Sequence, residues 1–276
     1  QLLHGQYAEL RQYATLYERL GCQIVRQKNR LHSAVGQLFH ELTRVFKNIF
    51  GVTARAMLYN HAAAVVVRDL SEESFIASVR LNFAGKRLFV SKLRRAHALA
   101  AISVGVQDGV QALQLMVQQQ LQTLALLERQ WEDARAALVD AFLALPESRY
   151  LLSVHGIGLV SAAIILAEVG DPSHYHNGRQ WIKLAGSQPM PNTSGRKTWS
   201  RTPMSRKGRP RLRTTLFFAV MRLVQVDDAF GRQYLHFQQR EKNPLTKMQP
   251  LGALLNKLLR ILWALVRNDN MNNPSF

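Results

Sequence analysis

The stretch VQALQLMVQQQLQTLALLERQWEDARAALVDA, residues 110–141, decides the fold class. Its apolar residues recur every three or four positions, a spacing that places their side chains on one face of an α-helix. They are Val110, Leu113, Val117, Leu124, Leu127, Trp131, Ala134, Leu138 and Ala141. The spacing predicts one long amphipathic helix, and Pro146 ends it because proline cannot continue the backbone hydrogen bonding.

A matching stripe lies near the start of the chain, between about Leu10 and Ile49. It consists of Leu10, Tyr13, Tyr17, Leu20, Ile24, Leu31, Ala34, Leu38, Leu42 and Val45. Gln27 and Gln120 occupy the seams of the two stripes, as polar residues do where they set coiled-coil register. We therefore expect coiled-coil partners that pair within the chain, between chains, or both. The alternative is an ordinary helical bundle with two solvated glutamines.

The whole chain predicts an all-α protein with a long antiparallel or intersubunit coiled coil and a compact helical domain after it. We expect a helical linker region over residues 1–145, with a small basic insertion at about 51–100, and a C-terminal domain over 146–276. SEES at residues 71–74 has the form of an N-cap with early acids and opens a short helix. Pro210 suits the first turn of a later helix.

The composition points to a polyanionic partner. Lysine and arginine total 36 against 18 acidic residues, a net charge of +18. Nucleic acid fits this excess best. A membrane partner is not expected, because the chain has no apolar run of 18 residues and no basic amphipathic helix with a Trp/Phe face. The single cysteine, Cys22, excludes an internal disulfide framework and is most simply a buried or partly buried apolar residue.

The basic charge is concentrated where acids are missing. The 55 residues from Pro172 to Val226 contain no Asp or Glu, and their centre reads NTSGRKTWSRTPMSRKGRPRLR over residues 192–213. Ser194 is a candidate nucleophile, since Gly195 gives the backbone freedom to present its hydroxyl and cations follow at once. Candidate phosphate stabilisers are Arg196, Lys197, Arg201 and Lys207; candidate nucleic-acid contacts are Arg206, Arg209, Arg211 and Arg213.

Other serines compete with Ser194 for this role. Ser187, Ser200 and Ser205 lie in the same segment, and a loop serine is most often a turn or cap residue. A serine nucleophile also needs its proton removed or its leaving group assisted. No carboxylate lies near Ser194 in sequence to do so.

Two further segments suit phosphate contacts. HGIGLVSAA, residues 155–163, has the form of a helix-hairpin-helix in which Gly156 and Gly158 permit the turn and the next helix start holds a backbone phosphate. The alternative is a hairpin used only for packing. Residues 74–107 contain no acid, and this stretch is either a second polyanion-binding surface or a solvated face. Its basic residues are Arg80, Lys86, Arg87, Lys92, Arg94 and Arg95.

A metal site is not expected in this chain. His174 and His176 invite that interpretation, but no acidic residue of the basic stretch completes a site and Cys22 is far away in sequence. A surface or capping role suits the two histidines better.

The combination of motifs resembles a known family. HGIG (155–158), AAIILAEVGD (162–171), AG (185–186), SG (194–195) and MSRKGRPRLR (204–213) are similar to the C-terminal domain of DEDD-class transposases of the insertion sequence 110 family, relatives of pilin-gene DNA invertases. The resemblance covers about residues 150–268. The helical region before it, including Arg26–His32, resembles the coiled-coil linker of the family.

The resemblance implies an activity and its parts. The nucleophilic serine of the family maps onto Ser194, and its basic block maps onto Ser205–Arg213, here with two basic residues where one lysine is usual. The chain reads Ala185-Gly186-Ser187-Gln188-Pro189 where the family has a leucine after the glycine. Family members begin with an acidic RuvC-like domain, and no such pattern occurs in this sequence. We therefore expect no cofactor in this chain and Mg²⁺ in the absent domain.

Three functions follow as hypotheses. The first is a DNA transposase or site-specific recombinase that a structured bridge RNA guides, working as a homo-oligomer (dimer or tetramer) in the bacterial cytoplasm at the nucleoid. The second is a non-catalytic nucleic-acid-binding protein derived from such an enzyme. The third is a repair-type helix-hairpin-helix protein.

Overall fold

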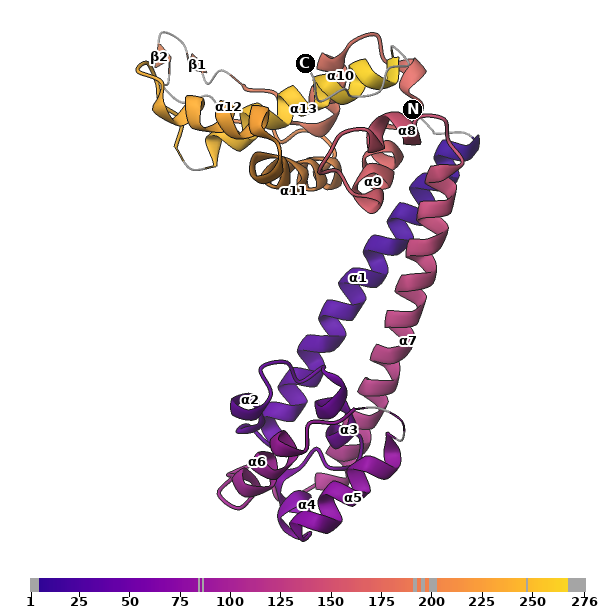
Figure 1. Ribbon diagram of the computed structural model, residues 1–276, viewed down its shortest axis with the longest axis vertical. Coiled ribbons are helices and arrows are strands. Elements are labelled where there is room, and N and C mark those ends of the chain that lie inside the picture. Colours follow the sequence, from indigo (N-terminus) through magenta and orange to yellow (C-terminus); the bar gives the residue numbers. More distant parts are fainter. Residues whose placement is uncertain are drawn as a thin grey trace. The chain divides into compact units, whose positions relative to one another are not determined.

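The protein is all-α apart from one short hairpin (Figure 1). The computed structural model describes residues 5–83, 85, 87–190, 193–194, 197–198, 203–246 and 248–267, with only the backbone described for Asn82, Thr193, Ser194, Lys197 and Thr198. Within these residues no helix combines the length and the apolar character needed to cross a membrane. The predicted fold class is confirmed.

The chain divides into two compact units. Unit 1 consists of Gln1–Tyr17 and Asp133–Phe276, and unit 2 of Glu18–Glu132. This division differs from the expected boundary at residue 145, because each long helix contributes to two cores. Leu10 and Ala14 of the first helix, with Leu138 and Phe142 of the second, are buried in the core of unit 1.

Two long helices pass through both units. They are α1 (Gly5–Leu38) and α7 (Val110–Leu143). In unit 1 the Tyr7 hydroxyl donates to Glu147, and in unit 2 the Gln27 side chain donates to the Gln120 carbonyl oxygen over 3.2 Å. The helices are therefore antiparallel partners within one chain. Gln27 is buried in the seam, as predicted.

The predicted first stripe is only partly one helix. We expected helical spacing as far as Ile49, but α1 ends at Leu38 and the chain turns into the short α2 (Leu42–Val45). Phe39, Leu42 and Phe46 remain buried, now in the core of unit 2. The same three-four spacing thus serves one helix, a turn and a second helix.

Unit 2 completes its core with short helices between α1 and α7. Ser71 caps one of them, α5, by accepting from the Ser74 amide over 3.2 Å, which confirms the predicted N-cap. On α7, Glu128 accepts two hydrogen bonds from Arg55, at 2.7 and 2.8 Å. The short helices are α3 (Val52–Asn60), α4 (Ala64–Arg68), α5 (Glu72–Asn82) and α6 (Val90–Ala100).

Unit 1 packs its remaining helices around α13, whose leucine face is buried. Pro210 occupies the first turn of α11, as predicted. The elements after α7 are α8 (Ser148–Leu152), α9 (Leu159–Val169), the 3₁₀ turn η1 (Pro172–His174), α10 (Gly178–Ala185), β1 (Thr193–Ser194), β2 (Lys197–Thr198), α11 (Pro210–Val226), α12 (Asp228–Gln239) and α13 (Gln249–Arg267).

Candidate functional site: the serine hairpin and its stem

Ser194 lies in the short antiparallel pair β1–β2. The register places the Cα of Ser194 opposite that of Lys197, and Thr193 opposite Thr198. The side chains of the predicted nucleophile and of Arg196, Lys197 and Arg201 lie outside the described residues, as do Lys86 and Ser200. What the structure describes in full is the stem that carries this hairpin, residues 186–190 and 203–208.

The stem is a backbone ladder. The Met190 amide donates to the Pro203 carbonyl and the Ser205 amide to the Gln188 carbonyl, both over 2.8 Å. The Arg206 amide donates to the Gly186 carbonyl over 2.9 Å. These bonds tie the two arms together below the hairpin and fix where the basic loop starts and ends.

Two glycines allow the arms to meet at the base. Gly186 ends α10 with a φ of +65°, in the left-handed region that favours glycine. A Cβ atom on Gly208 would lie 2.4 Å from the Gly186 nitrogen and 2.5 Å from the Leu184 carbonyl oxygen. Backbone therefore packs directly on backbone here, which accounts for a glycine at each of the two positions.

Ser187 is a structural residue rather than a candidate nucleophile. Its side chain is fully buried, and its Oγ lies 2.6 Å from Oδ1 of Asn256 on α13. The Asn256 amide returns a hydrogen bond to the Ser187 carbonyl over 3.2 Å. This reciprocal pair anchors the first arm to α13 and leaves no room for a phosphodiester. Ser205 is half-buried, and its Oγ accepts from the Lys207 amide over 3.3 Å.

An acidic side chain from outside the acid-free segment contacts arginines within it in the folded protein. Glu168 of α9 is only 2% exposed and lies outside the segment by four residues. Its Oε1 is 2.5 Å from Nε of Arg211, and its carbonyl accepts from Nη1 of Arg209. Burial, with the nearby Arg11 charge, lowers the pKa of Arg209. We predicted Arg209 and Arg211 as nucleic-acid contacts; the structure uses both to brace α9 against the start of α11.

The remaining predicted cations of this segment fall into two groups. Arg213 donates from Nη1 to the Ala185 carbonyl over 2.8 Å, so it too holds the base of the stem. Arg206 and Lys207 are exposed, and Arg206 adopts a φ of +54°, which is uncommon for a residue other than glycine. In the described part of the segment, these two residues are the ones placed to meet an anion beside the hairpin.

The predicted helix-hairpin-helix stretch folds as α8, a turn and α9. Gly156 adopts a φ of +102°, and a Cβ atom there would lie 3.0 Å from Val226 Cγ2. Gly158 is the N-cap of α9 and is exposed, with open space around it. Gly156 therefore serves packing against α11, whereas Gly158 leaves the start of α9 accessible. Phosphate contact at this turn stays a prediction.

The second basic surface belongs to unit 2. Arg80, Arg87, Lys92, Arg94 and Arg95 are exposed around α5 and α6. We expected no counter-charge, but Glu72 at the start of α5 lies 3.0 Å from Nε of Arg94. The acid comes from just before the acid-free stretch. Arg94 is therefore paired on the surface.

One smaller expectation, on Cys22, has an outcome, and the absence of a metal site stays a prediction. Cys22 is exposed, so the expectation that it is buried or partly buried is wrong. His174 lies 3.9 Å from Asp171, and among the described residues no group of three or more His, Cys, Asp or Glu could hold a metal ion.

Sequence reasoning missed Glu168 and Asn256. One signal for Glu168 was available, because it is a single acid in the otherwise apolar run AAIILAEV. Buried charges persist in cores only when they are paired. Asn256 gave no such signal, since it lies on the broad leucine-rich helix α13.

Relatives named as transposases and inverting proteins match this chain over part of their length. The identity is 31% over 128 residues to the probable family 20 transposase of Pseudomonas aeruginosa, covering 45% of this chain and 36% of that protein. It is 27% over 254 residues to an uncharacterized 44.8 kDa protein of insertion element IS116 from Streptomyces clavuligerus, covering 87% and 61%. It is 28% over 153 residues to the pilin gene-inverting protein of Moraxella lacunata, covering 51% and 46%.

The chain spans between 36% and 61% of the length of these relatives. The model of the Transposase IS116/IS110/IS902 family matches residues 148–235. That range holds Glu168, the stem, the serine hairpin and its helix α11. Residues 148–235 are therefore similar to the transposase domain that this family model describes.

Proposed function

We propose that this chain is the serine-bearing part of a DNA transposase or site-specific recombinase, with Ser194 as the nucleophile. The observation that carries the proposal is where the serine hairpin lies. It is inside the segment that matches a transposase family, on a paired stem, with the backbone of Lys197 opposite that of Ser194. The burial of Ser187 removes one competing serine.

The proposed step is a transesterification at a DNA phosphodiester. Ser194 Oγ loses its proton to a base and forms a bond to phosphorus, while the bond from phosphorus to the 3′ oxygen breaks. The products are a phosphoserine–DNA link and a 3′ oxygen, which takes up a proton and attacks in the later rejoining step. Arg196, Lys197, Arg201 and Lys207 stabilise the charge that builds up on the phosphorane.

The base and any metal belong, in this proposal, to an acidic RuvC-like domain beyond these 276 residues. The described residues do not fit a Mg²⁺ site, because they include no suitable acidic or histidine cluster. The part of the reaction that we propose for this chain therefore uses no metal ion. The contribution of the chain is to hold the serine and the cations around the scissile phosphate.

Guide-RNA binding and assembly are part of the same proposal. The exposed cations around α5 and α6 suit a nucleic-acid backbone, and we assign them to a structured RNA. We expect a homo-oligomer in which the acidic domain of one subunit meets Ser194 of another. Because the stripes of α1 and α7 pair within one chain, they no longer argue for self-association.

A trapping experiment tests the nucleophile. A DNA substrate with a 3′-bridging sulfur at the cleavage site carries a leaving group that needs little acid assistance. We expect wild-type protein supplied with a RuvC-like domain in trans to form a covalent adduct. Under the same conditions Ser194→Ala should form none while binding DNA as well as wild type. Ser205→Ala and Ser200→Ala are matched controls that keep the adduct.

An adduct that persists in Ser194→Ala would overturn the assignment of the nucleophile. Absence of an adduct in every variant, including wild type supplied with a RuvC-like domain in trans, would favour the non-catalytic nucleic-acid-binding protein instead.

A further inference from the structure

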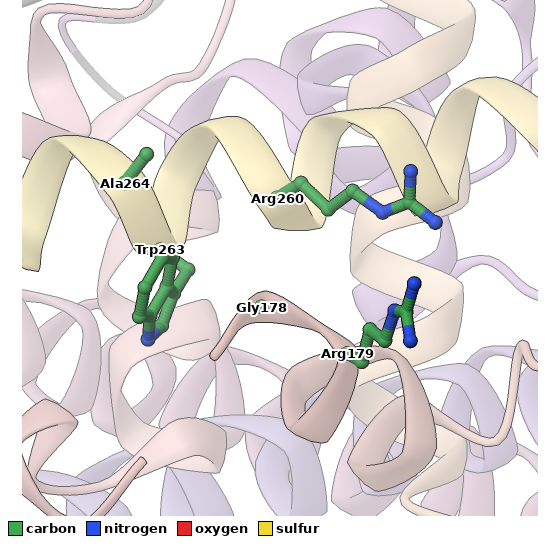
Figure 2. A pocket seen from close by; sticks show the side chains of 5 residues that line it. All are labelled: Gly178, Arg179, Arg260, Trp263 and Ala264. Carbon is green, nitrogen blue, oxygen red and sulfur yellow. The ribbon is translucent and has the colours of Figure 1, made fainter. Parts of the chain in front are cut away.

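A pocket lies at the end of α10 away from the serine stem (Figure 2). Its volume is about 320 Å³, and Gly178, Arg179, Arg260, Trp263 and Ala264 line it. All five belong to unit 1, and none takes part in the stem or in the proposed reaction. Because α10 has eight residues, the pocket and the base of the stem are about 12 Å apart along this helix.

The pocket exists because α10 begins very close to α13. Asn177 caps α10 by accepting from the amides of Arg179 and Gln180, at 3.0 and 3.3 Å. A Cβ atom on Gly178 would lie 3.2 Å from the Arg260 Cα, so only glycine gives this approach without displacement. Arg260, Trp263 and Ala264 follow one another at helical spacing on α13 and therefore share a face.

Two guanidinium groups meet at one side of this pocket. Figure 2 shows the side chains of Arg179 and Arg260, from different helices, extending to the same side with their charged ends facing each other. Both residues are exposed, and within the described residues neither guanidinium has an ion pair or a hydrogen bond. Like charges held close together repel, and an anion bound between them would be attracted to both and would offset this repulsion. Guanidinium groups suit phosphate oxygens in particular.

The opposite side of the pocket is aromatic. Trp263 is half-buried and lines the cavity. Its Nε1 is shielded from solvent and has no hydrogen-bond partner in the described part of the chain. A buried donor without an acceptor destabilises a protein. Tryptophan also offers a flat surface on which any nucleobase can stack.

We propose that this pocket binds one nucleotide of an unpaired nucleic-acid strand, with the phosphate between Arg179 and Arg260 and the base against Trp263. The proposal rests on the nucleic-acid chemistry of the proposed function, but it assigns a different site. It favours a single strand, since bases inside a duplex cannot reach an aromatic ring. Such a contact would hold the strand at a fixed distance from the serine stem.

Binding of a fluorescent twelve-nucleotide single strand tests the site. We expect the double variant Arg179→Ala/Arg260→Ala to bind at least tenfold more weakly than wild type. The dependence of log affinity on log salt should flatten by about 0.7, the value for one phosphate of a single strand. Trp263→Leu should weaken binding about tenfold, and Trp263→Phe should keep most of it, because stacking is worth roughly 1–3 kcal/mol per base.

The control variant removes the same charge elsewhere in unit 1. Arg222 and Arg232 are exposed on α11 and α12, so Arg222→Ala/Arg232→Ala should change affinity less than threefold. Binding of a hairpin duplex should suffer less in the pocket variant than binding of the single strand. The same assay compares single strands of DNA and RNA. Tighter binding of either one supports the site and identifies which nucleic acid the pocket takes.

The proposal is overturned if the pocket variant binds like the control variant, or if duplex and single strand weaken equally. If Trp263→Leu does not fold, as judged by circular dichroism, the arginine pair and Trp263→Phe decide. Ser194→Ala serves as a separate arm: it should bind the strand like wild type. Failure of the trapping experiment therefore leaves this binding result interpretable.

Discussion

Glu168 and Arg211 form an ion pair between α9 and α11, with Oε1 and Nε 2.5 Å apart. Both side chains are largely shielded from solvent, at 3% and 17% exposure. Arg209 lies beside them and donates to the Glu168 carbonyl. A single carboxylate thus secures the helix that follows the serine hairpin, and it links the apolar α9 to the most basic part of the chain.

Replacing this carboxylate should therefore destabilise unit 1. We expect Glu168→Gln to lower the free energy of unfolding by about 3–5 kcal/mol, because it removes the carboxylate charge that balances the buried Arg211 guanidinium. Urea denaturation followed by tryptophan fluorescence measures the change, since Trp181 is buried in unit 1. The control is Glu241→Gln at an exposed position. Equal stability of the two variants would contradict the assigned role.

The glycines of unit 1 should differ sharply in their tolerance of alanine. Gly208→Ala should cost about 2–3 kcal/mol, because the new methyl group meets backbone atoms that cannot move alone. Gly158→Ala should stay within about 1 kcal/mol, since its surroundings are open and its φ is −80°. Thermal unfolding compares them, and similar losses would argue against direct backbone packing at the stem.

Ser187 and Ser194 should respond differently to removal of the hydroxyl group. Ser187→Ala leaves Asn256 Oδ1 without its donor and should reduce stability by about 1–3 kcal/mol. Adduct formation should survive at a temperature where this variant is folded. Calorimetry and the trapping experiment together make the comparison. Loss of the adduct from a fully folded Ser187→Ala variant would reopen the choice of nucleophile.

Two leucines on α7 offer a matched test of pairing within the chain. Leu124 is fully buried and Leu126 is 55% exposed, only two residues away. Leu124→Asp should unfold unit 2, because an unpaired charge in a core costs several kcal/mol, whereas Leu126→Asp should be tolerated. Limited proteolysis of residues 18–132 reports the result. If Leu124→Asp instead gave folded monomers from an oligomer, the helix stripes would be pairing between chains.

The stability of unit 2 should fall in mild acid because of His61. This side chain is 7% exposed, its Nε2 lies 2.7 Å from Ser78 Oγ, and burial lowers its pKa. The unfolded chain, with a pKa near 6.5, then binds the proton more readily. Stability is full above about pH 6.5 and declines as the pH falls below it.

The measurement is the urea midpoint of unit 2 at pH 7.5 and pH 5. His61→Gln should show a smaller decline than wild type between these pH values, since it removes the group that prefers to charge in the unfolded state. An identical decline in both proteins would assign the effect to other residues.

The fold class and most helix positions could be predicted because they depend on local patterns. The spacing of Val117, Leu124 and Leu138 predicts α7, and Pro210 predicts the start of α11. The turn after Leu38 could not be predicted, since Phe39 and Leu42 continue the same spacing and are buried in the same core as Leu38.

The candidate site was predictable only in part for a related reason. Charge density along the chain identifies the basic segment around Ser194, but it does not show which cations are used internally. Arg211 and Glu168 are 43 residues apart, and Ser187 and Asn256 are 69 apart. Pairs at such separations depend on how α9, α11 and α13 pack. The exposure of Cys22 likewise depends on which side of α1 is covered.

The chain leaves unit 1 within α1 and returns to it within α7, so unit 2 is inserted into unit 1 with a continuous helix at each junction. Recombination between related genes could exchange unit 2 only as a cassette with two crossovers, near residues 17 and 133. Each crossover would have to preserve helical phase, because one inserted residue turns everything beyond it by about 100°. Evolution of unit 2 is thereby tied to insertions and deletions in its short helices and loops rather than in the two helices that carry it.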